Sequence, residues 1–210
     1  MLEIANLGET DRFDLLGRCL KALLGGGLLL LPTDTVYGLA VKVDMRAAVE
    51  RIFQVKGRKS EKALVVMVSS RAEAEELAVP VRRGDVTRLG ELWPGPLTLV
   101  VEAVDLAWKR AVAPGSRSLG IRIPDDRFLL DLLRRAGPLA VTSANLAGEE
   151  PPNSLAGVDA GLMKAADLVV DGGVYGSGRP STVAEISGKG LRLLRQGEIG
   201  EDTLQDILRS

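Results

Sequence analysis

The stretch LLLLPTDTVYGLAVKVDMRAAVERIFQVKGRKSEK (residues 28–62) decides the fold, because a strand, a polar turn and a cationic helix end follow one another in it. Four consecutive leucines at residues 28–31 predict a buried strand. Residues 32–38 interrupt this strand with a turn that begins at a proline, ends at a glycine and carries two threonine hydroxyls and one phenol. A turn of this composition can hold a polar ligand.

A short helix is predicted over residues 45–55, with Asp44 as its N-cap. Four cations follow the end of this helix: Lys56, Arg58, Lys59 and Lys62. Residues 51–62 together hold five cations and a single acidic residue, Glu61, so the segment is a local basic surface. Phosphate is the ligand that this surface suits best, and the alternative is a solvated surface without a binding role.

Apolar periodicity and capping residues predict strands and helices along the rest of the chain. Further strands are predicted at residues 39–43, 63–68, 97–101, 119–123, 139–142 and 168–170, with a final hairpin over residues 181–194. Helices are predicted between Asp11 and Gly25, after Ser70, after Asp126, near residues 154–166 and over residues 201–209. Strands alternate with helices at first, and paired strands occur elsewhere. We therefore predict a single α/β domain over residues 1–210, with a mixed β-sheet and flanking helices.

The composition is that of a globular protein and limits its binding partners. The 210 residues are 46% hydrophobic, and a formal net charge of −1 argues against a protein that coats nucleic acid by bulk electrostatics. The N-terminus lacks a signal-peptide pattern, and three glycines interrupt the longest apolar run, residues 23–31. We therefore predict a cytoplasmic protein that is neither secreted nor inserted in a membrane.

Two further counts restrict the chemistry. The chain contains no histidine, which excludes Ser-His and Cys-His nucleophilic devices and the commonest general base. Its single cysteine, Cys19, excludes disulfides within the chain and Cys-rich zinc sites, and favours a reducing compartment. Any catalysis must therefore rest on other groups.

Polar side chains gather at or near the ends of the predicted strands, the edge at which α/β sheets bind ligands. They are Thr33, Lys56, Arg58, Arg122, Ser143, Asn145, Ser181 and Arg195. Arg122 is informative because it interrupts an apolar strand, where a guanidinium must meet a carboxylate or a phosphate to offset its desolvation. Two hypotheses remain open at this point: Arg122 binds an anionic ligand, or it forms a structural ion pair with an aspartate.

Six separated motifs resemble, in the same order, the YrdC/Sua5/TsaC family of threonylcarbamoyl-AMP synthases. They are PTDTVYGL (32–39), KGR (56–58), WPGPLT (93–98), GIRIP (120–124), SAN (143–145) and ST (181–182). The resemblance covers nearly the whole chain, and several motifs in register are more specific than any one of them. It implies a YrdC-like twisted mixed sheet with an open concave ligand-binding face. It also implies the short form of the family, because the chain ends soon after Arg195.

The resemblance implies a nucleotidyltransferase that joins L-threonine, bicarbonate and ATP into threonylcarbamoyl-adenylate and pyrophosphate. Mg²⁺ would accompany ATP and not occupy a protein cage, since no Asp/Glu cluster lies in the motifs. The product would serve tRNA-threonylcarbamoyl transferase proteins that form threonylcarbamoyladenosine (t6A) in tRNA. Direct contact with tRNA or double-stranded RNA stays open, and no membrane partner is implied.

Site residues are carried over from the family by position. Lys56, Arg58, Ser143 and Asn145 match its Lys-x-Arg and Ser-x-Asn tetrad, and the resemblance implies that they bind ATP and carry catalysis. Ser118, Asn153 and Arg195 match weaker ATP contacts. Thr33, Arg122 and Ser181 match positions associated with threonine, and Tyr37 is expected to help close the pocket. Lys59 and Met67 depart from the proline and histidine that are common in the family.

Three rival functions remain. The same cationic concavity could track RNA, so a double-stranded RNA or tRNA-binding module without adenylate synthesis is the main alternative. A relative that has lost the activity is the second, although intact KGR and SAN motifs argue against it. Carbamoyl transfer, as in the related domain of hydrogenase maturation proteins, is the third, but those chains have several domains and zinc-finger segments.

Overall fold

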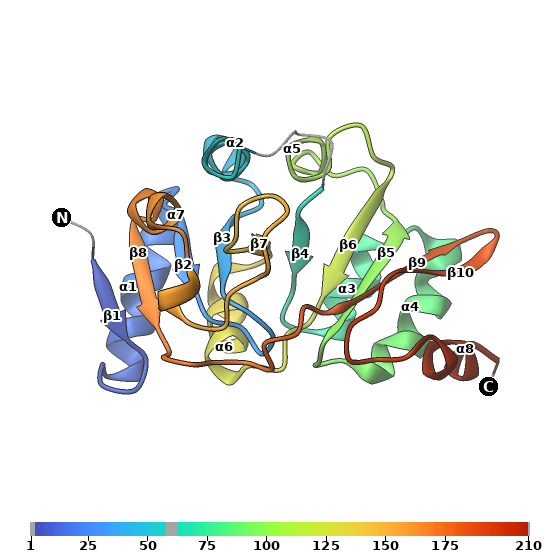
Figure 1. Ribbon diagram of the computed structural model, residues 1–210. Helices are drawn as coiled ribbons and strands as arrows, with labels where there is room; N and C mark the ends of the chain where they lie inside the picture. Colours follow the sequence, from blue (N-terminus) through green and yellow to red (C-terminus); the bar gives the residue numbers. More distant parts are fainter. Residues whose placement is uncertain (1–2, 58–62, 210) are drawn as a thin grey trace.

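A computed structural model describes residues 3–57 and 63–209. In this part of the chain ten strands form one sheet in the order β1-β8-β2-β3-β7-β4-β6-β5-β9-β10 (Figure 1). The strands are β1 (Ile4–Asn6), β2 (Leu29–Leu31), β3 (Gly38–Lys42), β4 (Val65–Met67), β5 (Leu97–Glu102), β6 (Ser118–Arg122), β7 (Leu139–Ser143), β8 (Leu168–Asp171), β9 (Thr182–Ser187) and β10 (Gly190–Arg195). The predicted α/β fold with one open sheet is confirmed.

The sheet is mixed, as predicted. β2 and β3 form an antiparallel hairpin in which Leu31 pairs with Gly38, so residues 32–37 make its turn. β7 runs antiparallel to both β3 and β4, whereas β4 pairs with β6, and β5 with β9, in parallel. The central strands therefore bring the turn, the end of β7 and the strand containing Arg122 into one neighbourhood.

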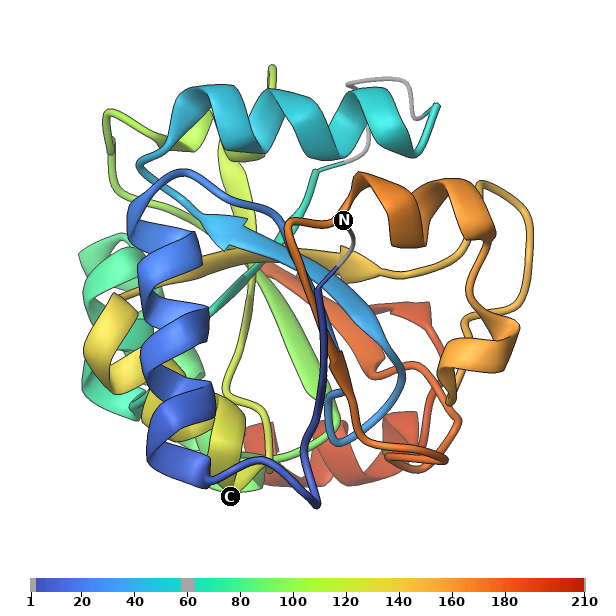
Figure 2. The same cartoon turned by 90° about the vertical axis from the view of Figure 1, so that its left-hand side faces the viewer.

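Helices cover both faces of the sheet. They are α1 (Arg12–Leu24), α2 (Arg46–Val55), α3 (Arg71–Leu77), α4 (Arg83–Leu89), α5 (Lys109–Val112), α6 (Arg127–Ala136), α7 (Ala160–Ala165) and α8 (Glu201–Arg209), with short 3-10 turns η1 (Pro80–Arg82), η2 (Gly90–Leu92) and η3 (Leu155–Gly157). Figure 2 shows α1 and α6 together on one side and α2 and α7 on the other. None of the helices in the described ranges is long and apolar enough to cross a membrane.

Two hydrophobic cores result from the alternation of side chains along the strands. Leu29 and Leu31 of β2 pack with α1 and α6, in the core that contains Leu15 and Leu132. Leu28 and Leu30 belong to the opposite core, which includes Ile52 of α2 and extends under β5 and β6. The four leucines that open the hairpin therefore serve both cores at once.

Local capping residues explain where several helices begin. Asp11 accepts hydrogen bonds from Phe13 N and Asp14 N at the start of α1, and Asp126 accepts one from Leu129 N at the start of α6. Each cap of this kind contributes about 1 kcal/mol. The capping box predicted after Ser70 is present in modified form, because Glu73 reaches back to Ser69.

Three local predictions were wrong or incomplete. Asp44 does not cap α2, since Met45 occupies the cap position without a side-chain hydrogen bond and Asp44 instead lies 3.7 Å from the Lys42 ammonium. The single helix predicted near residues 154–166 is divided into η3 and α7, because Asp159 caps a new helix there. β1 and α5 were not predicted, and both have only three or four residues.

Residues 171–181, here called the crossing segment, run from β8 to β9 along the lower ends of the central strands in Figure 1. Their backbone is tied to the turn of the β2–β3 hairpin by hydrogen bonds from Ser177 N to Asp34 O and from Gly178 N to Thr35 O. Gly176 is required at the point of contact, because its φ is +72° and a Cβ there would lie 2.6 Å from two carbonyl oxygens of the turn. The glycine-rich connection is thus a fixed wall beside the turn.

Cys19 gives a test of the core around α1. The thiol is fully buried, and burial raises its pKa from 9.0 to about 12, which lowers the thiolate fraction near pH 8 roughly a thousandfold. We expect iodoacetamide to alkylate the native protein at least about a hundredfold more slowly than the denatured protein, as followed by mass spectrometry. Equal rates would show that α1 does not pack as described.

Candidate functional site

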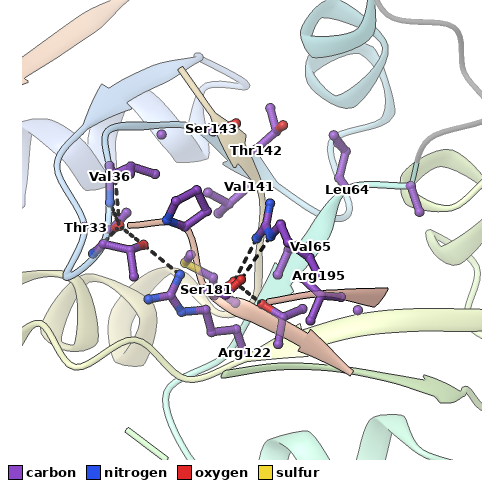
Figure 3. A pocket seen from close by; sticks show the side chains of 18 of the residues that line it. Thr33, Val36, Leu64, Val65, Arg122, Val141, Thr142, Ser143, Ser181 and Arg195 are labelled. Carbon is purple, nitrogen blue, oxygen red and sulfur yellow. Dashed lines mark hydrogen bonds between the residues drawn. The ribbon is translucent and has the colours of Figure 1, made fainter. Parts of the chain in front are cut away.

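A pocket of about 330 Å³ lies where the hairpin turn, β4, β5, β6, β7 and β9 meet (Figure 3). Its walls mix apolar side chains with a few polar groups, which is the usual character of a small-molecule site. The apolar wall includes Val36, Leu64, Val65, Met67, Val100, Val141 and Val183. The polar lining includes Thr33, Thr35, Thr98, Ser116, Ser118, Arg122, Thr142, Ser143, Ser181 and Arg195.

Arg122 occupies one side of this pocket, with its side chain only 4% exposed. Its NH2 nitrogen lies 2.7 Å from Asp34 Oδ1, its NH1 donates to Thr35 Oγ1 at 2.9 Å, and its Nε donates to Gly95 O at 3.3 Å. Arg122 therefore forms a structural ion pair with an aspartate, one of the two hypotheses from the sequence, and that aspartate is Asp34. Three of the five guanidinium N–H groups are engaged in this way, which leaves two for a ligand.

The hydroxyl of Thr33 organises the turn. It donates to Val36 O at 2.7 Å and accepts hydrogen bonds from the backbone nitrogens of Thr35 and Val36, each at 3.2 Å. Because its only hydrogen is used in this way, the 3.1 Å contact with Thr35 must have Thr35 as donor. A hydrogen-bond chain thus runs from Arg122 through both threonines to the backbone.

Ser181 lies beside Arg122 in the pocket and joins two strands (Figure 3). Its hydroxyl is 2.8 Å from that of Thr98 and accepts from Arg195 NH2 at 3.1 Å, while Arg195 Nε donates to Ser181 O at 3.0 Å. Burial, and secondarily the charge of Arg122, lower the pKa of Arg195. No carboxylate of residues 3–57 or 63–209 is within ion-pair distance of Arg195.

Ser143 and Thr142 lie across the pocket from Arg122 in Figure 3. Behind them, Lys56 is 5% exposed and its ammonium donates to Thr142 Oγ1 at 3.2 Å and to Ser143 O. Lys56 is the C-cap of α2, and Gly57, with a φ of +55°, follows directly and ends the helix. The hypothesis of a solvated surface is therefore wrong for Lys56, whereas Arg58, Lys59 and Lys62 lie outside the described residues.

The other predicted nucleotide contacts differ in their placement. Ser118 lines the pocket at the start of β6. Asn145 lies just beyond β7, where its amide nitrogen donates to the carbonyls of Leu146 and Glu149, and its buried Oδ1 accepts no hydrogen bond from the described residues. Asn153 is exposed, and its carbonyl accepts from Tyr175 N. Neither asparagine is among the residues that line the pocket.

Tyr37 contributes to the wall but its phenol faces the crossing segment. The side chain is fully buried, donates to Gly173 O at 2.9 Å and accepts from Gly172 N at 2.8 Å. Burial also raises the pKa of this phenol. Tyr37 therefore holds the crossing segment against the hairpin, which fits its expected role in closing one side of the pocket.

Sequence analysis missed two groups of the site. Asp34 was not singled out, although it is the only carboxylate in the turn and an ion pair with an aspartate was one of the two hypotheses for Arg122. Thr98 was quoted within a motif without a role, although a hydroxyl between two leucines of a strand signals a polar contact on one face. Among the described residues, no three Cys, Asp or Glu side chains are grouped so that they could hold a metal ion.

Comparisons with known proteins show which family the chain resembles. The family Sua5_yciO_yrdC, described as "Telomere recombination", matches residues 21–197. A threonylcarbamoyl-AMP synthase of Bacillus subtilis is 34% identical over 182 residues, which are 86% of this chain and 53% of that protein. One of Xanthomonas axonopodis pv. citri is 37% identical over 190 residues, covering 87% of this chain and 99% of that protein.

A solved structure, Pyrococcus abyssi Sua5 complexed with L-threonine, matches with a TM-score of 0.84 at 26% identity. The match covers 99% of this chain and 61% of that chain, so the chain spans only part of the longer relatives. The family match extends over most of the sequence, including the turn, Arg122, Ser143 and Ser181. The chain therefore belongs to the Sua5/YciO/YrdC family.

Proposed function

We propose that the protein is an L-threonylcarbamoyladenylate synthase, which forms threonylcarbamoyl-AMP and pyrophosphate from L-threonine, bicarbonate and ATP. The observation that carries the proposal is a single pocket with two chemically different sides, Arg122 paired with Asp34 on one and Ser143 backed by Lys56 on the other. Such a pocket suits a reaction that joins two different substrates. The names of the B. subtilis and X. axonopodis relatives support the same activity.

The Arg122 side suits the amino acid. Its two remaining N–H groups can grip a carboxylate in a two-pronged manner. Ser181 adds a hydroxyl beside it. The P. abyssi relative was solved in complex with L-threonine, which supports threonine as a substrate. Thr33 would shape the wall of the pocket and not donate a hydrogen bond to threonine, because its hydroxyl already donates to Val36 O.

The opposite side suits the nucleotide. Lys56 places an ammonium directly behind Ser143. Asn145 belongs to the proposal through its SAN motif, and it lies just beyond β7, outside the pocket lining. Ser118 would add a polar contact from the lining, and Arg195 would add one from its place beside Ser181 and Arg122. Arg58 belongs to the same proposal through its motif, and it lies outside the described residues.

The chemistry fits a site that lacks histidine. The threonine nitrogen and bicarbonate form a carbamate with loss of water, and a carbamate oxygen attacks the α-phosphorus of ATP. The bond between that phosphorus and the bridging oxygen breaks, and pyrophosphate leaves with the electron pair. The substrate supplies the nucleophile, so the protein has to align two anions and stabilise charge on the phosphates, for which fixed cations and hydroxyls suffice.

Mg²⁺ is part of this proposal as a companion of ATP, because the described residues offer no acidic cluster to hold it. When bound, it would neutralise charge on the departing pyrophosphate. We further propose a cytoplasmic reaction whose product is passed to the proteins that modify tRNA. Phosphate oxygens and the carboxylate of threonine remain the groups that this chain itself would bind.

Pyrophosphate release tests the proposal directly. We expect release from ATP only when threonine, bicarbonate and Mg²⁺ are all present, and loss of release when any one of them is omitted or the metal is chelated. Mass spectrometry should identify threonylcarbamoyl-adenylate as the other product. Salt-dependent binding of double-stranded RNA without any threonine-dependent pyrophosphate release would favour the RNA-binding alternative instead.

Replacing Lys56 by Met tests the nucleotide side. If the ammonium stabilises phosphate charge in a site closed to water, kcat/KM for pyrophosphate release should fall at least about thirtyfold, which corresponds to about 2 kcal/mol. The matched control is Arg46→Met on the same helix, whose side chain is 83% exposed, and it should change the rate less than about twofold. Similar rates in both variants, measured per folded protein, would remove Lys56 from the mechanism.

Replacing Arg122 by Lys tests the amino-acid side. Lysine keeps a positive charge near Asp34 but lacks the planar fork, so the KM for threonine should rise at least about tenfold with a smaller change in the KM for ATP. Arg117→Lys is the control, because the side chain of Arg117 is 89% exposed. A lower melting temperature with an unchanged threonine KM would mean that Arg122 has only a structural role.

A further inference from the structure

Both carboxylate oxygens of Asp34 accept hydrogen bonds, one of them from the site residue Arg122. Oδ1 accepts from Arg122 at 2.7 Å and Oδ2 accepts from the backbone nitrogen of Asp125 at 3.0 Å, while its carbonyl accepts from Ser177 N. The carboxylate is only 10% exposed, so solvent screens it weakly. A fixed negative charge therefore lies next to the two guanidinium N–H groups that remain for a ligand.

We propose that Asp34 is a specificity residue, which keeps the Arg122 side of the pocket for a carboxylate and excludes phosphate groups from it. This inference rests on the proposed function, in which one pocket must hold threonine on one side and the phosphates of ATP on the other. Without a charge that discriminates between them, the threonine carboxylate and a phosphate group would both be able to bind at Arg122. Phosphate at Arg122 would then block the threonine position.

The physical reason is the difference in ligand charge. Free threonine carries one carboxylate and one ammonium and is close to neutral, so the nearby Asp34 carboxylate repels it little. Phosphate brings up to two negative charges to the same guanidinium and meets Asp34 at close range. One additional unit charge a few Å away in a partly screened site changes affinity by at least about tenfold.

Arg195 increases the need for a negative charge that excludes phosphate. It lines the same pocket, and Ser181 is bonded to it while lying beside Arg122. Among the described carboxylates none pairs with Arg195, so Asp34, through its ion pair with Arg122, supplies the fixed negative charge at this pair of guanidinium groups. Removing the Asp34 charge would leave Arg122 and Arg195 as a doubly positive site, which is well suited to a phosphate.

The test uses the full chain without ATP. Titration calorimetry would measure the Kd of threonine and of inorganic phosphate, and the inhibition constant of phosphate against threonine binding, at constant ionic strength. For Asp34→Asn, in which an oxygen can still accept from Arg122, we expect phosphate to compete with threonine at least about tenfold more strongly than in the wild type. Adding Arg122→Gln to Asp34→Asn should abolish the gained affinity for phosphate in the direct titration, which places the phosphate at Arg122.

Two controls separate charge from structure. Asp34→Glu keeps the charge and should exclude phosphate as the wild type does, even if it binds threonine more weakly. Asp125→Asn removes a neighbouring exposed carboxylate and should behave as the wild type. The proposal is overturned if Asp34→Asn gains no affinity for phosphate, or if Asp34→Glu gains as much. Failure of the wild type to bind threonine would count against the proposed function, and the direct phosphate titrations would still decide the role of Asp34.

Discussion

The ion pair between Arg122 and Asp34 is the interaction on which the pocket depends. It joins β6 to the hairpin turn across 88 positions of sequence, and its two side chains are only 4% and 10% exposed. Taking both charges out of water is costly, and removing one partner of such a pair typically costs about 3–5 kcal/mol. That is a large part of the 5–15 kcal/mol that typically stabilises a whole domain, so the turn and β6 cannot separate independently.

The rest of the wall is arranged around this pair. Thr35 accepts a hydrogen bond from a second nitrogen of Arg122, and its hydroxyl contacts that of Thr33, which in turn donates to the backbone of the turn. The guanidinium is therefore held by a chain of hydroxyls as well as by charge. From the other side, the crossing segment is bonded to the turn and Tyr37 is bonded to the crossing segment. Networks of this kind fix one arrangement of their members because each unsatisfied buried group would be penalised.

Sequence analysis succeeded where the determinants are local. The Asp11 and Asp126 caps and the leucine strand β2 depend on neighbouring residues, and the structure has them as predicted except that β2 begins at Leu29 and not at Leu28. The prediction failed at Asp44, where the side chain lies near Lys42 instead of the helix start, and at the division between η3 and α7. Short elements such as β1 were missed because three residues carry too little periodicity.

The site shows the same division between local and long-range information. The need of Arg122 for a carboxylate or a phosphate follows from its place in an apolar strand, but the identity of its partner, Asp34, depends on how β6 reaches the hairpin turn. The cations after α2 form one cluster in the sequence, yet the fold turns Lys56 inward to the neutral oxygens of Thr142 and Ser143. Arg122 is paired with a carboxylate at the pocket, whereas Lys56 donates to two oxygens of β7 behind it, so the fold places two similar charges in different surroundings. That difference is a property of the assembled pocket, because residue type alone assigns the same positive charge to both side chains.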